Sequence, residues 1–281
     1  MLSVTKVLNN NVVIANHEAY EEVVLIGKGL GFGKKPGDEI AGTQAEKFFV
    51  LKDQAEQEQY MSLLEYVEED FIGVMNEFID KLEDRFGARL NEHIHVGLTD
   101  HLHFAVKRIQ QGQGINNPFL QETELAYPQE YAVATELTEW FGHQVGVRIP
   151  AGEIGFITLH IHSALTNRNL AEVNRHTQMV GELVDIIEEN LAMQIDRRDM
   201  NYLRLVRHLH HAIERIQFEN YVENQDALKD VLQQQYPVCY NLSWKLMKVM
   251  QRRLKKAVPD AEAVYLTLHL QRIVDNVRKI N

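Results

Sequence analysis

Two histidine-bearing segments of the sequence each occur twice, and their imidazole rings are the side chains best suited to chemistry. Residues 100–110 (DHLHFAVKRIQ) return at residues 207–217 (RHLHHAIERIQ) with seven of eleven positions identical. Residues 153–160 (EIGFITLH) return at residues 262–269 (EAVYLTLH). Because histidine changes its charge most readily near neutral pH, four matched rings predict reversible chemistry. These rings belong to His101 and His160 in the first copy and to His208 and His269 in the second.

Reversible phosphorylation is one chemistry that fits these four histidines. Each flanks an apolar stripe at helical spacing, which alone indicates a hydrogen-bonded residue at the edge of a helical core. An edge position tolerates many residue types, so retention in both copies argues for a further role. A neutral ring nitrogen near solvent can accept a phosphoryl group as nucleophile. That group brings about −2 charge, which can move a domain interface, so the paired histidines predict a switch with two inputs.

Metal binding is the alternative, and a metal-dependent enzyme is the function that would go with it. The ligands would be His101, His103, His160 and His162. Histidines two residues apart point to different faces of a helix, and the sequence holds no HExxH motif. No GxSxG elbow or cysteine-centred arrangement indicates nucleophilic hydrolysis. The sequence therefore predicts a protein without cofactor or metal that is not an enzyme.

The matched segments lie 107 to 109 residues apart, so a unit of about that length is duplicated. Tyr127-Pro128 is likewise echoed by Tyr236-Pro237. From Asp53 onward apolar residues recur at three- and four-residue steps, and no strong strand pattern follows Leu51. A periodic internal match indicates repeated architecture. We therefore expect two all-helical bundle domains, at residues 60–170 and 171–281.

The segment before the repeats has strand character. Short β-type runs occupy residues 2–8, 12–15, 23–26 and 47–51, with an asparagine turn at residues 9–11 and a glycine-rich loop at residues 27–38. Four strands in so few residues form a sheet with little core, so we expect this module to dimerise. The predicted fold class is α+β multidomain: a small antiparallel four-stranded β domain at residues 1–55, followed by the two duplicated all-α domains.

Charge is unevenly distributed between these modules. The net charge is −11, yet residues 1–52 carry six lysines and six acidic residues and are neutral. The remaining residues hold the whole excess of acid and repel polyanions. Any contact with nucleic acid must therefore fall on the first domain.

The glycine-rich loop is the candidate for that contact. It does not match a nucleotide-binding P-loop, because Gly33-Lys34 is followed by Lys35 and no helix pattern comes after it. It offers one exposed aromatic ring, Phe32, on which an unpaired base could stack, and lysines that could follow phosphates. A long hairpin loop with solvated lysines remains the structural alternative.

These segments together resemble a known family over essentially the full chain. Residues 6–12 (KVLNNNV) and 24–38 (VLIGKGLGFGKKPGD) look like the co-antiterminator RNA-binding domain of BglG/SacY-type transcriptional antiterminators. The histidine motifs resemble those of the two phosphotransferase-system (PTS) regulation domains that follow it; they are residues 98–105, 152–160, 205–209 and 263–269. Residues 152–168 and 236–240 are most similar to the glucose-operon branch, the GlcT-like antiterminators.

The resemblance implies a function and a set of partners. The RNA-binding domain works as a symmetric dimer that holds a hairpin in the mRNA leader and prevents an overlapping terminator from forming upstream of sugar-transport genes. The PTS sugar permease (enzyme II) phosphorylates the first regulation domain, and HPr acts on the second. A chain of this kind works in the cytoplasm. The sequence agrees, since it has one cysteine, no signal peptide and no apolar run of membrane-spanning length.

The resemblance also carries site residues over by position. The phosphorylatable histidines are His101, His160, His208 and His269. The RNA-contacting set is Lys6, Asn9, Asn11, Gly27, Lys28, Gly31 and Phe32, with Lys34 and Lys35 for phosphates. Many members have arginine in place of Lys28, and lysine is a point charge, so we expect Lys28 to contact a phosphate and not a base. His103, His162, His210 and His211 receive no role.

Overall fold

The structure is a computed structural model in which the chain forms two compact units. Unit 1 contains residues 1–116 and 132–168, and unit 2 contains residues 117–131 and 169–281. The structure describes residues 1–8, 10–19, 21–27, 29–45, 47–49, 58–59, 62–64, 66–219 and 226–280. Among these residues, no helix combines the length and the apolar character needed to cross a membrane.

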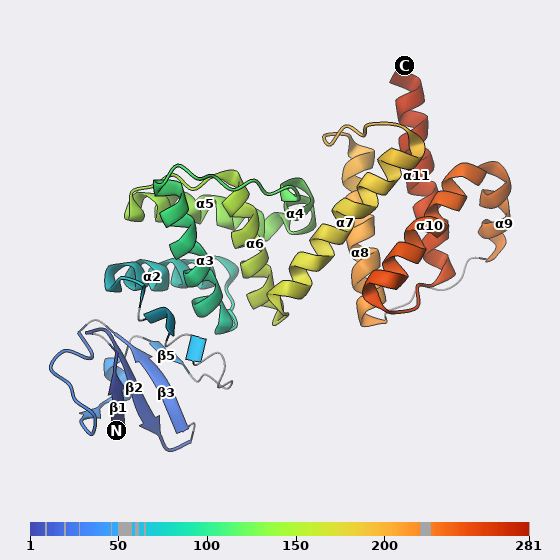
Figure 1. Ribbon diagram of the computed structural model, residues 1–281. Helices are drawn as coiled ribbons and strands as arrows, with labels where there is room; N and C mark the ends of the chain where they lie inside the picture. Colours follow the sequence, from blue (N-terminus) through green and yellow to red (C-terminus); the bar gives the residue numbers. More distant parts are fainter. Residues whose placement is uncertain are drawn as a thin grey trace. The chain divides into compact units, whose positions relative to one another are not determined.

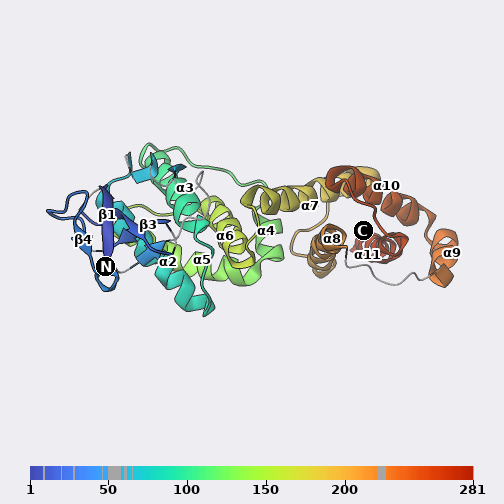
Figure 2. The ribbon, with the colours of Figure 1, turned by 90° about the horizontal axis from the view of Figure 1, so that it is seen from below.

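Unit 1 begins with an antiparallel sheet whose strand order is β4-β1-β2-β3-β5. Figure 1 labels β1, β2, β3 and β5, and Figure 2 labels β4. Residues Val4 and Ala15 pair between the first two strands, and a bulge follows Val4. Ile14 and Val24 pair between the second and third strands. The strands are β1 Leu2–Val7, β2 Val12–His17, β3 Glu21–Ile26, β4 Glu39–Ile40 and β5 Lys47–Phe49.

Both faces of this sheet are buried, because apolar side chains occupy successive positions in β2 and β3. Val13 and Ala15 point to one face, where Leu30 of the glycine-rich loop joins them. Val12 and Ile14 point to the other face, as the two-residue period of a strand requires. That second face packs against Leu63 and Val67, which precede the first long helix, and against Ile72, which lies in it. The small sheet thus gains a core from the following segment.

Long helices, α2, α3, α5 and α6, complete the described part of unit 1 (Figure 1 and Figure 2). Their core includes Phe78, Leu98, Leu102, Phe141 and Ile157. The helices are α2 Glu69–Phe86, α3 His93–Gln110, α5 Pro128–Val145 and α6 Ala151–Thr166, of which α5 begins in unit 2. Gly87 and Asn167 end α2 and α6 in the left-handed conformation, where those two residue types are tolerated best.

The described part of unit 2 is all-helical. Asn169 and Asp199 begin α7 and α8 by accepting a backbone N–H with their side chains, as N-cap residues do. A Cβ on Gly181 of α7 would lie 2.5 Å from the ring of Phe119, so glycine is needed for the segment before α4 to pack there. The helices are α4 Leu120–Ala126, α7 Leu170–Leu191, α8 Met200–Phe218, α9 Asp226–Gln235, α10 Pro237–Leu254 and α11 Asp260–Ile280.

The predicted fold class is confirmed, with one addition to the sheet. The four expected strands are β1, β2, β3 and β5, although residues 50 and 51 lie outside the described part. β4 was not predicted, because two residues carry no periodicity. The repeat would assign residues 117–131 to the first helical domain, whereas they pack within unit 2. The domain boundaries given above stay a prediction.

Candidate functional site

In unit 1, the candidate histidines face each other across α3 and α6. Leu98 and Leu102 bury one side of α3 in the core, which turns His101 toward α6. The ring centroids of His101 and His160 are 5.2 Å apart, and the side chain of His101 is 19 % exposed. The two rings therefore form one site, with His101 on its solvent side.

A buried carboxylate lies beneath this site. Glu153 of α6 places Oε2 3.0 Å from Nε2 of His101 and accepts a 2.6 Å hydrogen bond at Oε1 from Arg108. Neither Nε2 of His101 nor Oε2 of Glu153 has a partner that meets hydrogen-bond geometry, so their contact is electrostatic. Burial disfavours the charged form of Glu153, but His101 and Arg108 outweigh it and hold its pKa below the usual value.

His160 is the buried member of the pair. Burial, together with the nearby rings of His101 and His93, lowers the pKa of His160 to about 3. Gly97 of α3 lies directly against it, since a Cβ there would be 3.4 Å from two ring atoms. His160 is therefore neutral at pH 7 and is shielded from solvent.

Unit 2 repeats this arrangement between α8 and α11. The rings of His208 and His269 are 4.5 Å apart, and Nε2 of His208 lies 3.7 Å from Oε2 of Glu262. Arg215 donates two hydrogen bonds to Glu262, of 2.9 and 2.8 Å. Burial, then His269 and Arg215, lowers the pKa of His208 to about 3. Burial, then Arg272 and Arg204, lowers that of His269 as well.

The glutamate–arginine pairs are functional candidates that the sequence interpretation missed. Glu153 and Glu262 open one repeated segment, and Arg108 and Arg215 stand near the end of the other. Their identity in both copies was visible in the sequence. Nothing in the sequence says that residues 45 or 47 positions apart meet, so their pairing required the structure.

The four histidines proposed as alternative metal ligands are not gathered into one group. His103 is buried on another face of α3, where it stacks on Tyr66 at 5.7 Å. Within the described part of the chain, the one group of three potential ligands is His210, His211 and Glu214 on α8. The histidines of the first repeat are thus absent from the groups of described residues that could hold a metal ion.

The glycine-rich loop and the asparagine turn lie against each other at one end of the sheet. Gly31 donates its backbone N–H to the carbonyl of Asn10 at 2.8 Å, and Gly27 donates to that of Asn11 at 2.9 Å. The side-chain oxygen of Asn11 accepts a 2.6 Å hydrogen bond from the backbone of Gly29. Gly29 has φ of +70°, a conformation that favours glycine.

The loop leaves the side chains of Phe32 and Lys35 outward. Phe32 is 76 % exposed, which is unusual for a large apolar side chain. Lys6 and Lys35 are exposed, whereas Lys34 is half-buried and donates to the carbonyl of Glu39 at 3.1 Å. Asn9 and Lys28, also predicted to contact RNA, lie outside the described residues.

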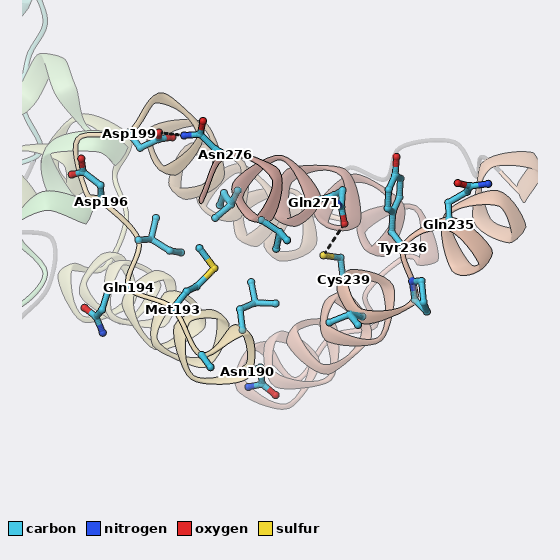
Figure 3. A pocket seen from close by; sticks show the side chains of 17 residues that line it. Asn190, Met193, Gln194, Asp196, Asp199, Gln235, Tyr236, Cys239, Gln271 and Asn276 are labelled. Carbon is cyan, nitrogen blue, oxygen red and sulfur yellow. Dashed lines mark hydrogen bonds between the residues drawn. The ribbon is translucent and has the colours of Figure 1, made fainter. Parts of the chain in front are cut away.

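Unit 2 also contains a pocket of about 990 Å³, which lies between the end of α7 and the facing ends of α10 and α11 (Figure 3). Cys239 donates to Gln271 at 3.3 Å on its wall, and Asn276 bonds to Asp199. Among the described residues that line it, there is no lysine, arginine or histidine.

These features define an RNA-binding module joined to a duplicated histidine-bearing regulatory module. Residues 2–58 match the CAT RNA binding domain, and residues 76–164 and 181–273 each match the PRD domain. The chain belongs to the family of transcriptional antiterminators that carry a CAT RNA binding domain and two PRD domains. It is thus a regulator and not an enzyme, as the sequence predicted.

Relatives match along the whole chain. It is 51 % identical over 275 residues to the PtsGHI operon antiterminator of Bacillus subtilis (strain 168), covering 98 % of each chain. It is 36 % identical to the GlcA/glcB genes antiterminator of Staphylococcus carnosus (strain TM300), covering 98 % of this chain and 97 % of that relative. The solved structure "Crystal structure of GlcT CAT-PRDI" matches with 53 % identity and a TM-score of 0.54, covering 59 % of this chain and 98 % of that one.

Proposed function

We propose that this chain is an antiterminator of a glucose PTS operon that works in the cytoplasm. As a dimer, its first domain binds a hairpin in the mRNA leader and prevents a terminator from forming. Phosphorylation of histidines in the two PRD domains controls that binding, with a PTS sugar permease acting on the first domain and HPr on the second. The glucose assignment is supported by the names of the relatives, which include a PtsGHI operon antiterminator.

The observation that carries the regulatory part is the repeated site itself. Each PRD domain holds a pair of histidines over a buried glutamate that an arginine neutralises. A pair of this kind next to an RNA-binding domain supports a charge switch, because a phosphoryl group on the ring would add about −2 charge beside that carboxylate.

The protonation state of the rings supports phosphoryl acceptance. At pH 7 the lowered pKa of His208 keeps its ring neutral, so one ring nitrogen carries a lone pair. That nitrogen attacks the phosphorus of the donor's phosphorylated side chain. A P–N bond forms on the acceptor, the bond from phosphorus to the donor breaks, and the ring proton of the acceptor passes to solvent or to the donor. No oxidant or further reactant is needed.

The exposure of the two histidines in the first PRD domain suggests the order in which they are phosphorylated. The His101 side chain is 19 % exposed and His160 is 8 % exposed. The donor can approach His101 directly, whereas His160 becomes reachable only after α3 and α6 separate. We therefore propose that His101 accepts phosphate first.

Phosphate on His101 would act on the pair below it. The added charge lies close to Glu153, and like charges in a buried place repel strongly. Arg108, which is bonded to Glu153, would exchange the carboxylate for the phosphate, which it can bind with two parallel hydrogen bonds. That exchange would shift α3 against α6.

Mass spectrometry tests the regulatory part directly. The full chain is incubated with Enzyme I, HPr, phosphoenolpyruvate and the soluble domains of candidate permeases. Phosphate is expected on His101 with a permease and on His208 or His269 with HPr. His143, an exposed histidine on α5, is the control and should stay unmodified. Phosphate on none of the four predicted histidines, while the donors remain active on their other substrates, would exclude the switch.

RNA binding is tested separately with the unphosphorylated chain. Binding to a hairpin with internal loops should weaken as the salt concentration rises, because phosphate contacts release counterions. Absence of binding at low salt would count against the RNA part alone.

A further inference from the structure

Each PRD domain holds a second histidine two residues after the first, and the proposed function gives it no role. In an α-helix this spacing places the two rings on different faces. His101 and His208 face the neighbouring histidine. His103 and His210 are buried on the back of α3 and α8, at 3 % and 4 % exposure. We name His103 and His210 the back-face histidines.

In the first PRD domain, the back-face histidine meets a tyrosine from the segment before α2. The rings of His103 and Tyr66 stack at 5.7 Å with an interplanar angle of 27°. The Tyr66 hydroxyl donates a 2.6 Å hydrogen bond to Asp100, the residue before His101. Nδ1 of His103 is buried and lacks a hydrogen-bond partner, and Nε2 lies 3.5 Å from Oε2 of Glu68 without meeting hydrogen-bond geometry. Buried polar atoms of this kind are costly, so the position has a reason other than stability.

Tyr66 leads to the RNA-binding sheet. Its neighbours Leu63 and Val67 pack in one cluster with the sheet residues Val12, Ile14, Val24 and Ile26. The segment around Tyr66 therefore contacts both the back face of α3 and the apolar cluster of the sheet.

In unit 2, the other back-face histidine also meets a tyrosine from upstream in the chain. His210 Nε2 lies 2.9 Å from the hydroxyl of Tyr127, and the two rings are perpendicular at 4.9 Å. Tyr127 is 3 % exposed and stands between α4 and α5, in the segment 117–131 that packs within unit 2. From residue 132 onward, α5 belongs to unit 1.

We infer that the back-face histidines are positioning residues, each of which fixes an upstream tyrosine to the helix that carries a phosphorylatable histidine. Through Tyr66, α3 is linked to the RNA-binding sheet; through Tyr127, α8 is linked to α5. This inference rests on the proposed function, since it says how a charge added at His101 or His208 reaches the rest of the chain. The partners differ between copies: Asp100, which holds Tyr66, is replaced by Arg207 in the second repeat.

The first test measures how strongly phosphorylation changes RNA affinity in the full chain. The readout is the ratio of Kd values with and without phosphate on His101. In Tyr66→Leu and in His103→Leu, phosphate incorporation at His101 should equal that of wild type. Phosphate should nevertheless change the Kd for RNA by no more than about twofold in these variants. His103→Phe keeps the stacked ring and should restore the wild-type ratio. Phe218→Leu, at an exposed aromatic outside both contacts, should leave it unchanged.

A wild-type ratio in both leucine variants would overturn the inference. If the wild-type protein shows no phosphate on His101, or no change in RNA affinity when phosphorylated, the proposed function is wrong. The linkage through Tyr66 is then tested by a second readout that does not need phosphorylation. His101→Asp should change amide hydrogen exchange in residues 62–67 of otherwise wild-type protein, and should not do so together with Tyr66→Leu. The same exchange pattern in both backgrounds overturns the inference.

The repeat supplies a matched pair for the second contact. Tyr236 is the counterpart of Tyr127, and it packs against apolar residues of unit 2. Tyr127→Phe removes the hydroxyl that contacts His210. It should reduce the change in RNA Kd caused by phosphate on His208 at least about threefold, while Tyr236→Phe should leave that change as in wild type. Equal responses in the two variants would remove Tyr127 from the linkage.

Discussion

Arg215 donates hydrogen bonds to both carboxylate oxygens of Glu262, at 2.9 and 2.8 Å. In the first PRD domain, the corresponding Arg108 donates to a single oxygen of Glu153, and its Nε is buried without a partner. The second oxygen of Glu153 instead faces His101. In the first domain, one carboxylate oxygen thus contacts an arginine and the other a histidine. In the second domain, the arginine donates to both oxygens. A charge added to His101 therefore acts on a less completely paired glutamate.

Removing Arg215 should be strongly destabilising. Glu262 is 2 % exposed, so Arg215→Ala leaves a buried carboxylate without its cation. We expect a loss of about 3 kcal/mol in the free energy of unfolding, measured by urea denaturation. The control is Arg253→Ala, whose partner Glu182 keeps 40 % of its side chain exposed, and it should cost less than about 1 kcal/mol. Equal losses in the two variants would show that burial of the glutamate has no bearing on stability.

Glu153 should be required for phosphorylation of His101 and not of His208. Glu153→Gln keeps the size of the side chain but removes the charge that faces His101 and pairs with Arg108. Loss of ring orientation should slow phosphorylation of His101 about 10- to 100-fold, as measured by quenched time courses. Phosphorylation of His208 in the same molecules is the internal control.

The matched control for that variant is Glu136→Gln. Glu136 is exposed and pairs with Arg85 on the surface of the same unit. Its replacement should leave both rates unchanged. A Glu153→Gln protein phosphorylated on His101 at the wild-type rate would show that the carboxylate has no part in the acceptor site.

Features set by residues close together in the chain could be predicted from the sequence, and contacts between distant residues could not. The strands and helices follow from alternation and helical periodicity, and the twin histidine sites follow from self-similarity. The partnership of Glu153 with Arg108 and the stacking of Tyr66 on His103 could not be predicted, because each joins residues far apart in the chain. β4 was missed because two residues give no pattern. The packing of Phe119 on Gly181 depends on tertiary contacts alone.

Stability should fall as the pH is lowered below about 6.5, partly because of His160. Its folded pKa is about 3, below the unfolded value near 6.5, so between these values the unfolded chain binds more protons than the folded chain. The stabilising contribution is fully present above pH 6.5 and decreases as the pH falls toward 3. One such histidine contributes up to about 1.4 kcal/mol per pH unit.

Urea denaturation at pH 7, 6 and 5 measures this slope. His160→Gln should reduce the slope of the unfolding free energy against pH by the contribution of one histidine, because glutamine does not titrate. His143→Gln, at an exposed position, should leave the slope as it is in wild type. Parallel curves for wild type and His160→Gln would mean that the ring of His160 is protonated in the folded chain.

Lys35 should contribute to RNA binding through charge alone. It is exposed on the glycine-rich loop, whereas Lys34 is already bonded to the carbonyl of Glu39. Lys35→Gln should weaken binding to all hairpins by a similar factor and should reduce the slope of log Kd against log salt by about one. An unchanged slope would show that Lys35 does not contact a phosphate.

Phe32 should contribute through stacking, and salt separates its effect from that of the lysine. Its ring is 76 % exposed and contributes little to folding, so Phe32→Ala should leave the urea midpoint unchanged. Loss of one stacked base should weaken hairpin binding by about 1–3 kcal/mol in a filter assay, with the salt slope preserved. Phe218→Ala, an exposed phenylalanine on α8, is the control and should bind as wild type. Wild-type affinity in Phe32→Ala would show that the exposed ring serves something other than RNA.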